Sequence, residues 1–136
     1  MSAPIADPNR LLCTLDPVLH EWAYAFACLP DGADLRGLEP LAIFREDEGL
    51  TVVLREETAL AHQVPILFRA AWITLRVQSD LAAVGLTAAF AQVLAEARIS
   101  TNVIAGAHHD HLFVPVDEAG RAMAVLRELQ RRWALV

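Results

Sequence analysis

Lysine is absent from this sequence of 136 residues, so its 11 basic residues are all arginine, and they face 17 acidic residues. Without lysine the chain cannot form a lysine Schiff base or hold a phosphate with a P-loop lysine. The net charge of -6 leaves no basic footprint of the kind that nucleic-acid-binding proteins carry. We therefore expect no nucleic acid among its partners.

Long hydrophobic runs and cysteines are also scarce. The longest uncharged stretch, residues 81–95, is too short to cross a bilayer, so no membrane partner is expected. Residues 1–10 have no basic start and no apolar run, which predicts a flexible leader rather than a secretory signal. Cys13 and Cys28 lie in apolar segments without a CxxC spacing, which predicts buried, reduced thiols. Together these features predict a cytoplasmic protein.

The second half of the chain has the pattern of a β-α-β-β-α unit. Period-two alternation predicts strands over residues 70–77, 100–106 and 111–116. Apolar residues recur on one helical face between the first two strands: Leu86, Phe90, Val93, Leu94 and Ala97. A second apolar stripe follows the third strand: Ala119, Ala122, Met123, Leu126, Leu129 and Trp133. The order is ferredoxin-like, with its last strand missing or borrowed.

Three residues of this half are candidates for helix caps. Ser79 and Asp80 precede the first helical pattern, and Asp117 precedes the second. Side chains of these types accept hydrogen bonds from the first N–H groups of a helix.

The first half is also rich in strands. We expect strands over residues 11–15, 22–29, 41–45 and 50–54, and a short helix over 56–62. Asp16 and Pro17 are expected to open a helical turn, and Gly49 to supply a positive φ in the acidic turn after the third strand. The predicted lobes are residues 11–64 and 65–136. Each would be only marginally stable alone, so they are expected to share a sheet or an interface.

Two segments resemble the small bacterial tandem ACT-domain proteins, which are related to the regulatory part of aspartate kinases and to CASTOR-type arginine sensors. One is residues 48–54, Glu-Gly-Leu-Thr-Val-Val-Leu, and the other is residues 99–115, where His109, Asp110 and His111 precede Leu-Phe-Val-Pro. The resemblance implies an α+β protein of two ferredoxin-like ACT lobes (βαββαβ) with antiparallel sheets. It also implies a regulatory sensor that binds an amino acid or similar small ligand and has no catalytic site or cofactor.

The resemblance also implies where the ligand binds. ACT ligands usually sit at an interface between two ACT units, against the loop before the first helix and the edge of the second strand. The matching residues here are Ser79, Asp80, Leu81, Val84, Gly85, Leu86, Asn102, Val103, Ile104, Gly106, Ala107, His109 and Asp110. In the arginine sensors the residue matching Asp110 helps hold the ligand's cationic group, and the implied assembly is a homodimer. Such proteins often have glycine where this chain has Arg98, so a left-handed cap there would cost about 1 kcal/mol or be absent.

The residues themselves support a ligand site on separate grounds. A helix start after Ser79 and Asp80 offers unpaired N–H groups to a carboxylate, and Gly85 allows close approach. Asp110, or a carbonyl near Gly106, could accept an ammonium group. Alternatively, the pair only caps a helix and the glycine only permits packing.

Two other functions remain open. The chain could be a protein-interaction module whose ligand site is vestigial. It could instead be a metal-dependent enzyme that uses the cluster from His108 to His111, although one face of a strand would offer only two histidines and zinc needs three or four ligands. Trp72 lies opposite Ile73, so it is expected to pack on the other lobe, to pack on a second chain, or to be exposed.

Overall fold

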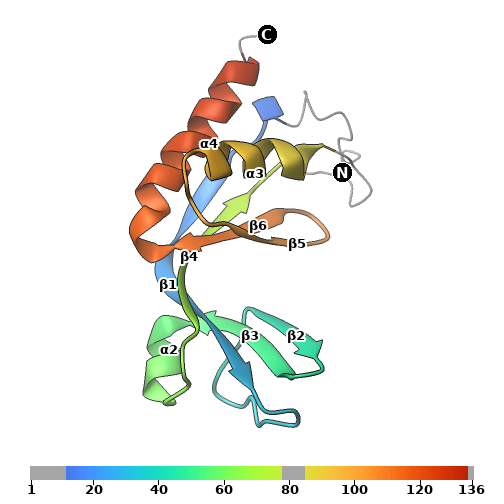
Figure 1. Ribbon diagram of the computed structural model, residues 1–136, viewed down its shortest axis with the longest axis vertical. Coiled ribbons are helices and arrows are strands. Elements are labelled where there is room, and N and C mark those ends of the chain that lie inside the picture. The colour runs from blue at the N-terminus through green and yellow to red at the C-terminus, as the bar shows by residue number, and fades with distance from the viewer. Residues whose placement is uncertain (1–11, 78–84, 135–136) are drawn as a thin grey trace. The chain divides into compact units, whose positions relative to one another are not determined.

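The computed structural model describes residues 12–77 and 85–134 of the chain (Figure 1). By its contacts the chain divides into unit 1, residues 1–20 with 72–136, and unit 2, residues 21–71. The backbone passes from one unit to the other inside two strands, β1 (Pro17–Leu29) and β4 (Phe68–Leu75). Each unit is therefore assembled from both halves of the sequence. The expected lobes, 11–64 and 65–136, stay a prediction, and the expected leader lies outside the described residues.

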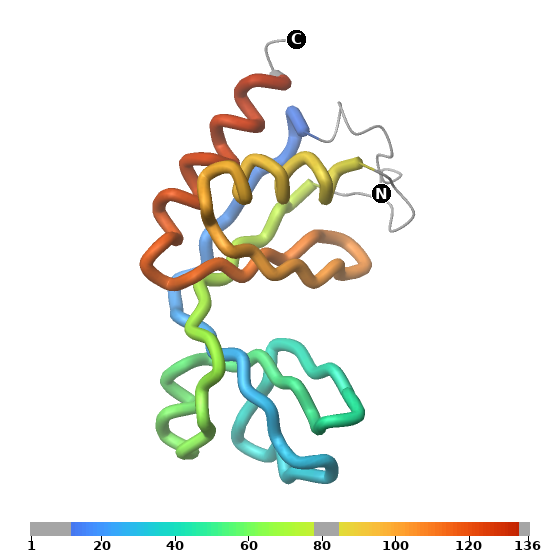
Figure 2. Tube along the Cα trace, in the orientation of Figure 1, coloured from blue at the N-terminus to red at the C-terminus, as the bar shows by residue number. Residues whose placement is uncertain are grey.

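Strands β1 and β4 are hydrogen-bonded neighbours in the sheet, and the tube trace shows them running alongside each other (Figure 2). In unit 1 the Arg76 N–H donates to the Asp16 carbonyl at 3.2 Å, and in unit 2 the Leu67 N–H donates to the Phe26 carbonyl at 2.8 Å. The partner numbers fall on one strand as they rise on the other, so the two strands run antiparallel.

Unit 2 contains β2 (Ala42–Glu46), β3 (Gly49–Arg55) and the short helix α2 (Glu56–Ala61), and its strand order is β2-β3-β1-β4. The expected strands, acidic turn and short helix of this region are confirmed. Gly49 has a φ of +148°, and a Cβ there would lie 2.6 Å from the Leu29 carbonyl oxygen, so the turn requires glycine. Residues 30–41 contain turns and no helix, because two prolines and two glycines interrupt this segment.

Unit 1 contains the elements that were expected for the second half of the chain. They are α3 (Leu86–Glu96), β5 (Asn102–Ala105), β6 (Asp110–Pro115), the 3-10 turn η1 (Val116–Glu118) and α4 (Ala119–Ala134). Its strand order is β1-β4-β6-β5. The start of β1 therefore supplies the fourth strand, so the ferredoxin-like prediction with a borrowed strand is confirmed.

The predicted apolar faces of α3 and α4 are buried. Leu86, Phe90 and Leu94 of α3 are at most 3% exposed. The buried residues of α4 are Ala122, Met123, Leu126 and Leu129. In the part of the chain that the structure describes, no helix is long and apolar enough to cross a membrane.

Four local predictions are wrong. Residues 12–13 form a helical turn instead of a strand, and Pro17 begins β1 instead of a helical turn. Proline is tolerated as the first residue of a strand, where no ladder hydrogen bond is lost. Asp117 lies inside η1, whose N-cap is Pro115, and no side chain caps this turn. Cys28 is exposed and Cys13 is only half-buried, so the expected burial of both thiols is not found.

Helix α3 ends in a left-handed residue although glycine is missing there. Arg98 has a φ of +61°. The Arg98 N–H donates to the Ala95 carbonyl, and the Ile99 N–H donates to the Leu94 carbonyl, both at 2.9 Å. This is the hydrogen-bond pattern of a Schellman motif, with buried Ile99 and Leu94 as its apolar pair. Burial of that pair compensates for a conformation that a side chain at this position disfavours.

Arg98→Gly should stabilise the protein by about 0.5–1 kcal/mol, because glycine adopts the left-handed conformation without a Cβ penalty. The measurement is urea unfolding followed by circular dichroism. Arg98→Ala is the control, since it removes the exposed guanidinium but keeps the Cβ. Equal stabilisation by both substitutions would show that charge, and not backbone conformation, is responsible.

Candidate functional site

Asp110 lies near the C-terminal end of strand β4. It opens β6, pairs with Ala105 across the β5–β6 hairpin, and belongs to the strand that neighbours β4. Immediately before it, the His109 ring Nδ1 lies 3.4 Å from the carbonyl oxygen of Val77, just past the end of β4. In Figure 1, α3 begins at the end of unit 1 where β6 also begins.

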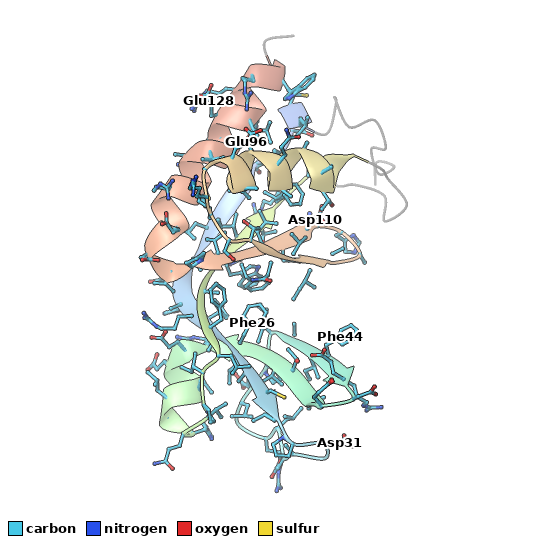
Figure 3. The ribbon with its side chains drawn as sticks, viewed as in Figure 1. Phe26, Asp31, Phe44, Glu96, Asp110 and Glu128 are labelled. Atoms are coloured by element: carbon cyan, nitrogen blue, oxygen red, sulfur yellow. The ribbon has the colours of Figure 1, made fainter. Side chains whose placement is uncertain are left out.

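The carboxyl group of Asp110 is buried on the face of the sheet that forms the core of unit 1. Asp110, which is labelled in Figure 3, is 8% exposed. The residues that alternate with it on the same face, Leu112 and Val114, are fully buried. Burial raises the pKa of the Asp110 carboxyl, and nearby His111 and His109 lower this pKa in part. Among the residues that the structure describes, none donates a hydrogen bond to this carboxylate. Taking a carboxylate out of water is costly unless an opposite charge or donors compensate, so the position favours a bound cation.

The start of α3 offers the opposite chemistry. The N-cap of the described helix is Gly85, with a φ of +105° and no side-chain hydrogen bond to the first turn. The first turn also contains no acidic residue. The first N–H groups of a helix lack partners within the helix, so together with the positive end of the helix dipole they suit an anion. The cap residues expected from the sequence, Ser79 and Asp80, lie outside the described residues, as do Leu81 and Val84.

The sheet divides the remaining predicted site residues between its two faces. Val103 pairs with Leu112 and so shares the core face with Asp110, whereas Asn102 and Ile104 pair with Phe113 and His111 on the opposite face. Gly106 closes the hairpin with an N–H that donates to the His109 carbonyl at 2.8 Å, and Ala107 is exposed. The structure thus brings Gly85, Leu86 and Asp110 to one end of unit 1, and places Asn102 and Ile104 elsewhere.

The face opposite the helices holds a cluster that the sequence did not reveal. The His20 ring stacks on Trp72 with centroids 3.4 Å apart, and the Trp72 indole donates to His111 Nδ1 at 3.1 Å. Trp72 is half-buried, and His20 and His111 are partners that the sequence did not anticipate. Only the strand register places His20 and His111 beside it, and no short-range sequence pattern encodes that register.

Histidine clustering does not produce a metal centre in the described part of the chain. His108 and His109 precede β6, so the expected alternation of four residues along a strand holds only from Asp110 onward. Within residues 12–77 and 85–134, no three histidine, cysteine, aspartate or glutamate side chains gather to hold a metal ion.

Comparison with family models assigns both parts of the chain to the same family. One ACT-domain model matches residues 3–71 and a second ACT-domain model matches residues 67–128. The chain therefore belongs to the ACT-domain family and carries two such domains in tandem. ACT domains are regulatory domains, and they are not catalytic. A search of proteins with curated functions found no match.

Solved structures agree with this assignment. A Vibrio cholerae protein of unknown function, described as a possible transport protein, is 46% identical, with a TM-score of 0.82 over 90% of this chain and 94% of that one. A protein from Agrobacterium tumefaciens is 18% identical, with a TM-score of 0.66 over 84% and 87%. The ligand-free regulatory subunit of aspartate kinase from Thermus thermophilus is 9% identical, with a TM-score of 0.63 over 85% and 97%. The last two show a shared fold only.

Asp110→Asn should stabilise the ligand-free protein at pH 7. Because folding raises the pKa of this carboxyl, the folded state holds the proton more tightly than the unfolded state. The stability of the native chain therefore falls as the pH rises from about 3.8, the ordinary aspartate value, through the folded pKa. The advantage of the variant should shrink as the pH is lowered through that window. Urea unfolding at several pH values measures it, and a destabilised Asn variant at pH 7 would contradict the burial argument.

Proposed function

We propose that this protein is a regulatory amino-acid sensor whose ligand binds in unit 1, between the buried carboxylate of Asp110 and the start of α3. The observation that carries the proposal is the burial of Asp110, which raises the pKa of its carboxyl. An α-ammonium group placed there would supply the missing opposite charge and up to three donors.

The second charge of an amino acid fits the start of α3. Its α-carboxylate would accept hydrogen bonds from the first N–H groups of the helix, which follow Gly85, where the helix dipole is favourable. Together the two positions select a molecule with adjacent positive and negative groups. Membership of the ACT-domain family supports this proposal, and so does the fold shared with aspartate kinase regulatory subunits.

A sensor needs two states that the ligand distinguishes. In the ligand-free state the Asp110 carboxylate carries a desolvation cost, and the ligand removes this cost by pairing with it. The ligand therefore stabilises the conformation in which α3 closes on the start of β6, relative to any conformation that hydrates Asp110. This differential interaction would couple ligand concentration to a partner of the protein.

Thermal denaturation against the twenty amino acids tests the proposal. A ligand present at 100 times its Kd should stabilise the protein by about 2.7 kcal/mol, which appears as a higher Tm. Asp110→Asn should lose most of this ligand-induced shift, because the amide keeps the shape but not the charge.

Asp117→Asn is the matched control and should keep the shift, since Asp117 is exposed and lies in η1. No shift with any amino acid at 10 mM would contradict the sensor proposal. It would instead favour a protein-interaction module with a vestigial site.

Self-association is the second part of the proposal, with a homodimer as its simplest form. Strand β2 lies at the edge of the sheet, and its Ile43 and Phe44 are 48% and 69% exposed. An edge strand with exposed apolar side chains is a template for pairing with a second copy of the same strand.

Phe44→Lys should convert the dimer to a monomer, because it places a charge in the proposed interface. Light scattering after gel filtration gives the mass of the particle. Leu67→Lys is the control, since Leu67 is 73% exposed and lies just outside β4. A monomeric native chain, or a dimer that persists in the Phe44 variant, would rule out this interface.

A further inference from the structure

The face of the unit 1 sheet opposite the helices contains a hydrogen-bonded group that the sensor proposal does not use. We name it the histidine–tryptophan cluster, and it consists of His20 of β1, Trp72 and Thr74 of β4, and His111 of β6. Three hydrogen-bond contacts join it. Trp72 Nε1 lies 3.1 Å from His111 Nδ1, Thr74 Oγ1 lies 3.2 Å from the same nitrogen, and His20 Nε2 lies 2.7 Å from Thr74 Oγ1.

The indole determines which nitrogen of His111 carries a proton. An indole N–H can only donate, so His111 Nδ1 must accept and cannot itself be protonated. The neutral His111 ring therefore carries its proton on Nε2. Protonation at Nδ1 would bring two N–H groups face to face at 3.1 Å, and the hydrogen bond to Trp72 would be lost.

His20 does not face the same restriction. The Thr74 hydroxyl can donate to His20 Nε2 when that nitrogen carries no proton, and it can accept from His20 Nε2 when that nitrogen is protonated. A charged His20 ring would also be compatible with the stacked face of Trp72. Of the two histidines, His111 is therefore the one whose protonation breaks a hydrogen bond of the cluster.

We propose that His111 is a proton-sensitive latch on Trp72, in which the neutral ring holds the indole N–H and the protonated ring releases it. Release of the indole N–H loosens the side-chain connection between β4 and β6 on the face of the unit 1 sheet opposite the helices. The conformation of this face therefore depends on pH.

The surroundings hold the latch closed at neutral pH. Burial lowers the pKa of His111, as does the neighbouring charge of His109, and Asp110 acts in the opposite direction. Burial also lowers the pKa of His20, with further contributions from His111 and Arg76. Release should therefore occur below pH 6.5, the ordinary histidine value.

Nuclear magnetic resonance of the 15N-labelled full chain tests the latch without any ligand. The indole N–H resonance of Trp72, assigned with Trp72→Phe, should shift with a midpoint below pH 6.5 while the backbone amide peaks stay dispersed. In His111→Asn the amide oxygen can replace Nδ1 as an acceptor that does not titrate, so the same resonance should be constant between pH 7.5 and 5. Exposed His62 provides the control, and His62→Asn should leave the titration unchanged.

Three results would overturn the latch. The first is a Trp72 indole resonance that does not titrate in the native chain, and the second is one that still titrates in His111→Asn. The third is read from the native chain alone and does not require any variant to fold. It is a neutral His111 ring whose nitrogen shifts place the proton on Nδ1.

Discussion

The antiparallel pairing of β1 with β4 is the constraint on which both units depend. Residues 17–20 of β1 complete the sheet of unit 1, and residues 68–71 of β4 complete the sheet of unit 2. Each unit is therefore unfinished without a segment from the other half of the sequence. Because side chains alternate along a strand, the same pairing also decides which residues share a face. The pairing of β1 with β4 places His20 beside Trp72 on the face of the unit 1 sheet opposite the helices.

The two faces of the unit 1 sheet have different chemical roles. The core face carries the buried carboxylate of Asp110 at the end of the sheet where α3 begins, and this combination suits a zwitterion. The face opposite the helices carries His111, whose Nδ1 accepts the indole N–H of Trp72. Asp110 and His111 are adjacent in sequence, so the proposed ligand position and the proposed proton-sensitive position are one residue apart on opposite faces. Charge at either residue influences the pKa of the other.

Much of the fold could be predicted from the sequence, because periodicity reports which face of an element is buried. The stripe of α3 and the hairpin formed by β5 and β6 were predicted on that basis, and the borrowed strand was anticipated as one of two possibilities. The start of β1 was mispredicted, since proline is tolerated both in the first turn of a helix and as the first residue of a strand. Arg98 was expected to disfavour a left-handed cap, and burial of Ile99 against Leu94 outweighs that preference.

The candidate site was only partly predictable. Asp110 and the region before α3 were identified from the resemblance to ACT-domain proteins, and the structure adds that Asp110 is buried. The histidine–tryptophan cluster was not predicted, because it depends on contacts between residues up to 54 positions apart, from His20 to Thr74. Strand register over such separations is decided by the whole sheet and not by any local pattern.

The most direct test of the central claim is a crystal structure of the chain grown with the amino acid that it binds most tightly. The account predicts that the ligand's ammonium nitrogen lies within about 3 Å of the Asp110 carboxylate, with its carboxylate at the first turn of α3. A ligand bound elsewhere on the chain would contradict it, and so would an Asp110 carboxylate paired with an arginine of the protein.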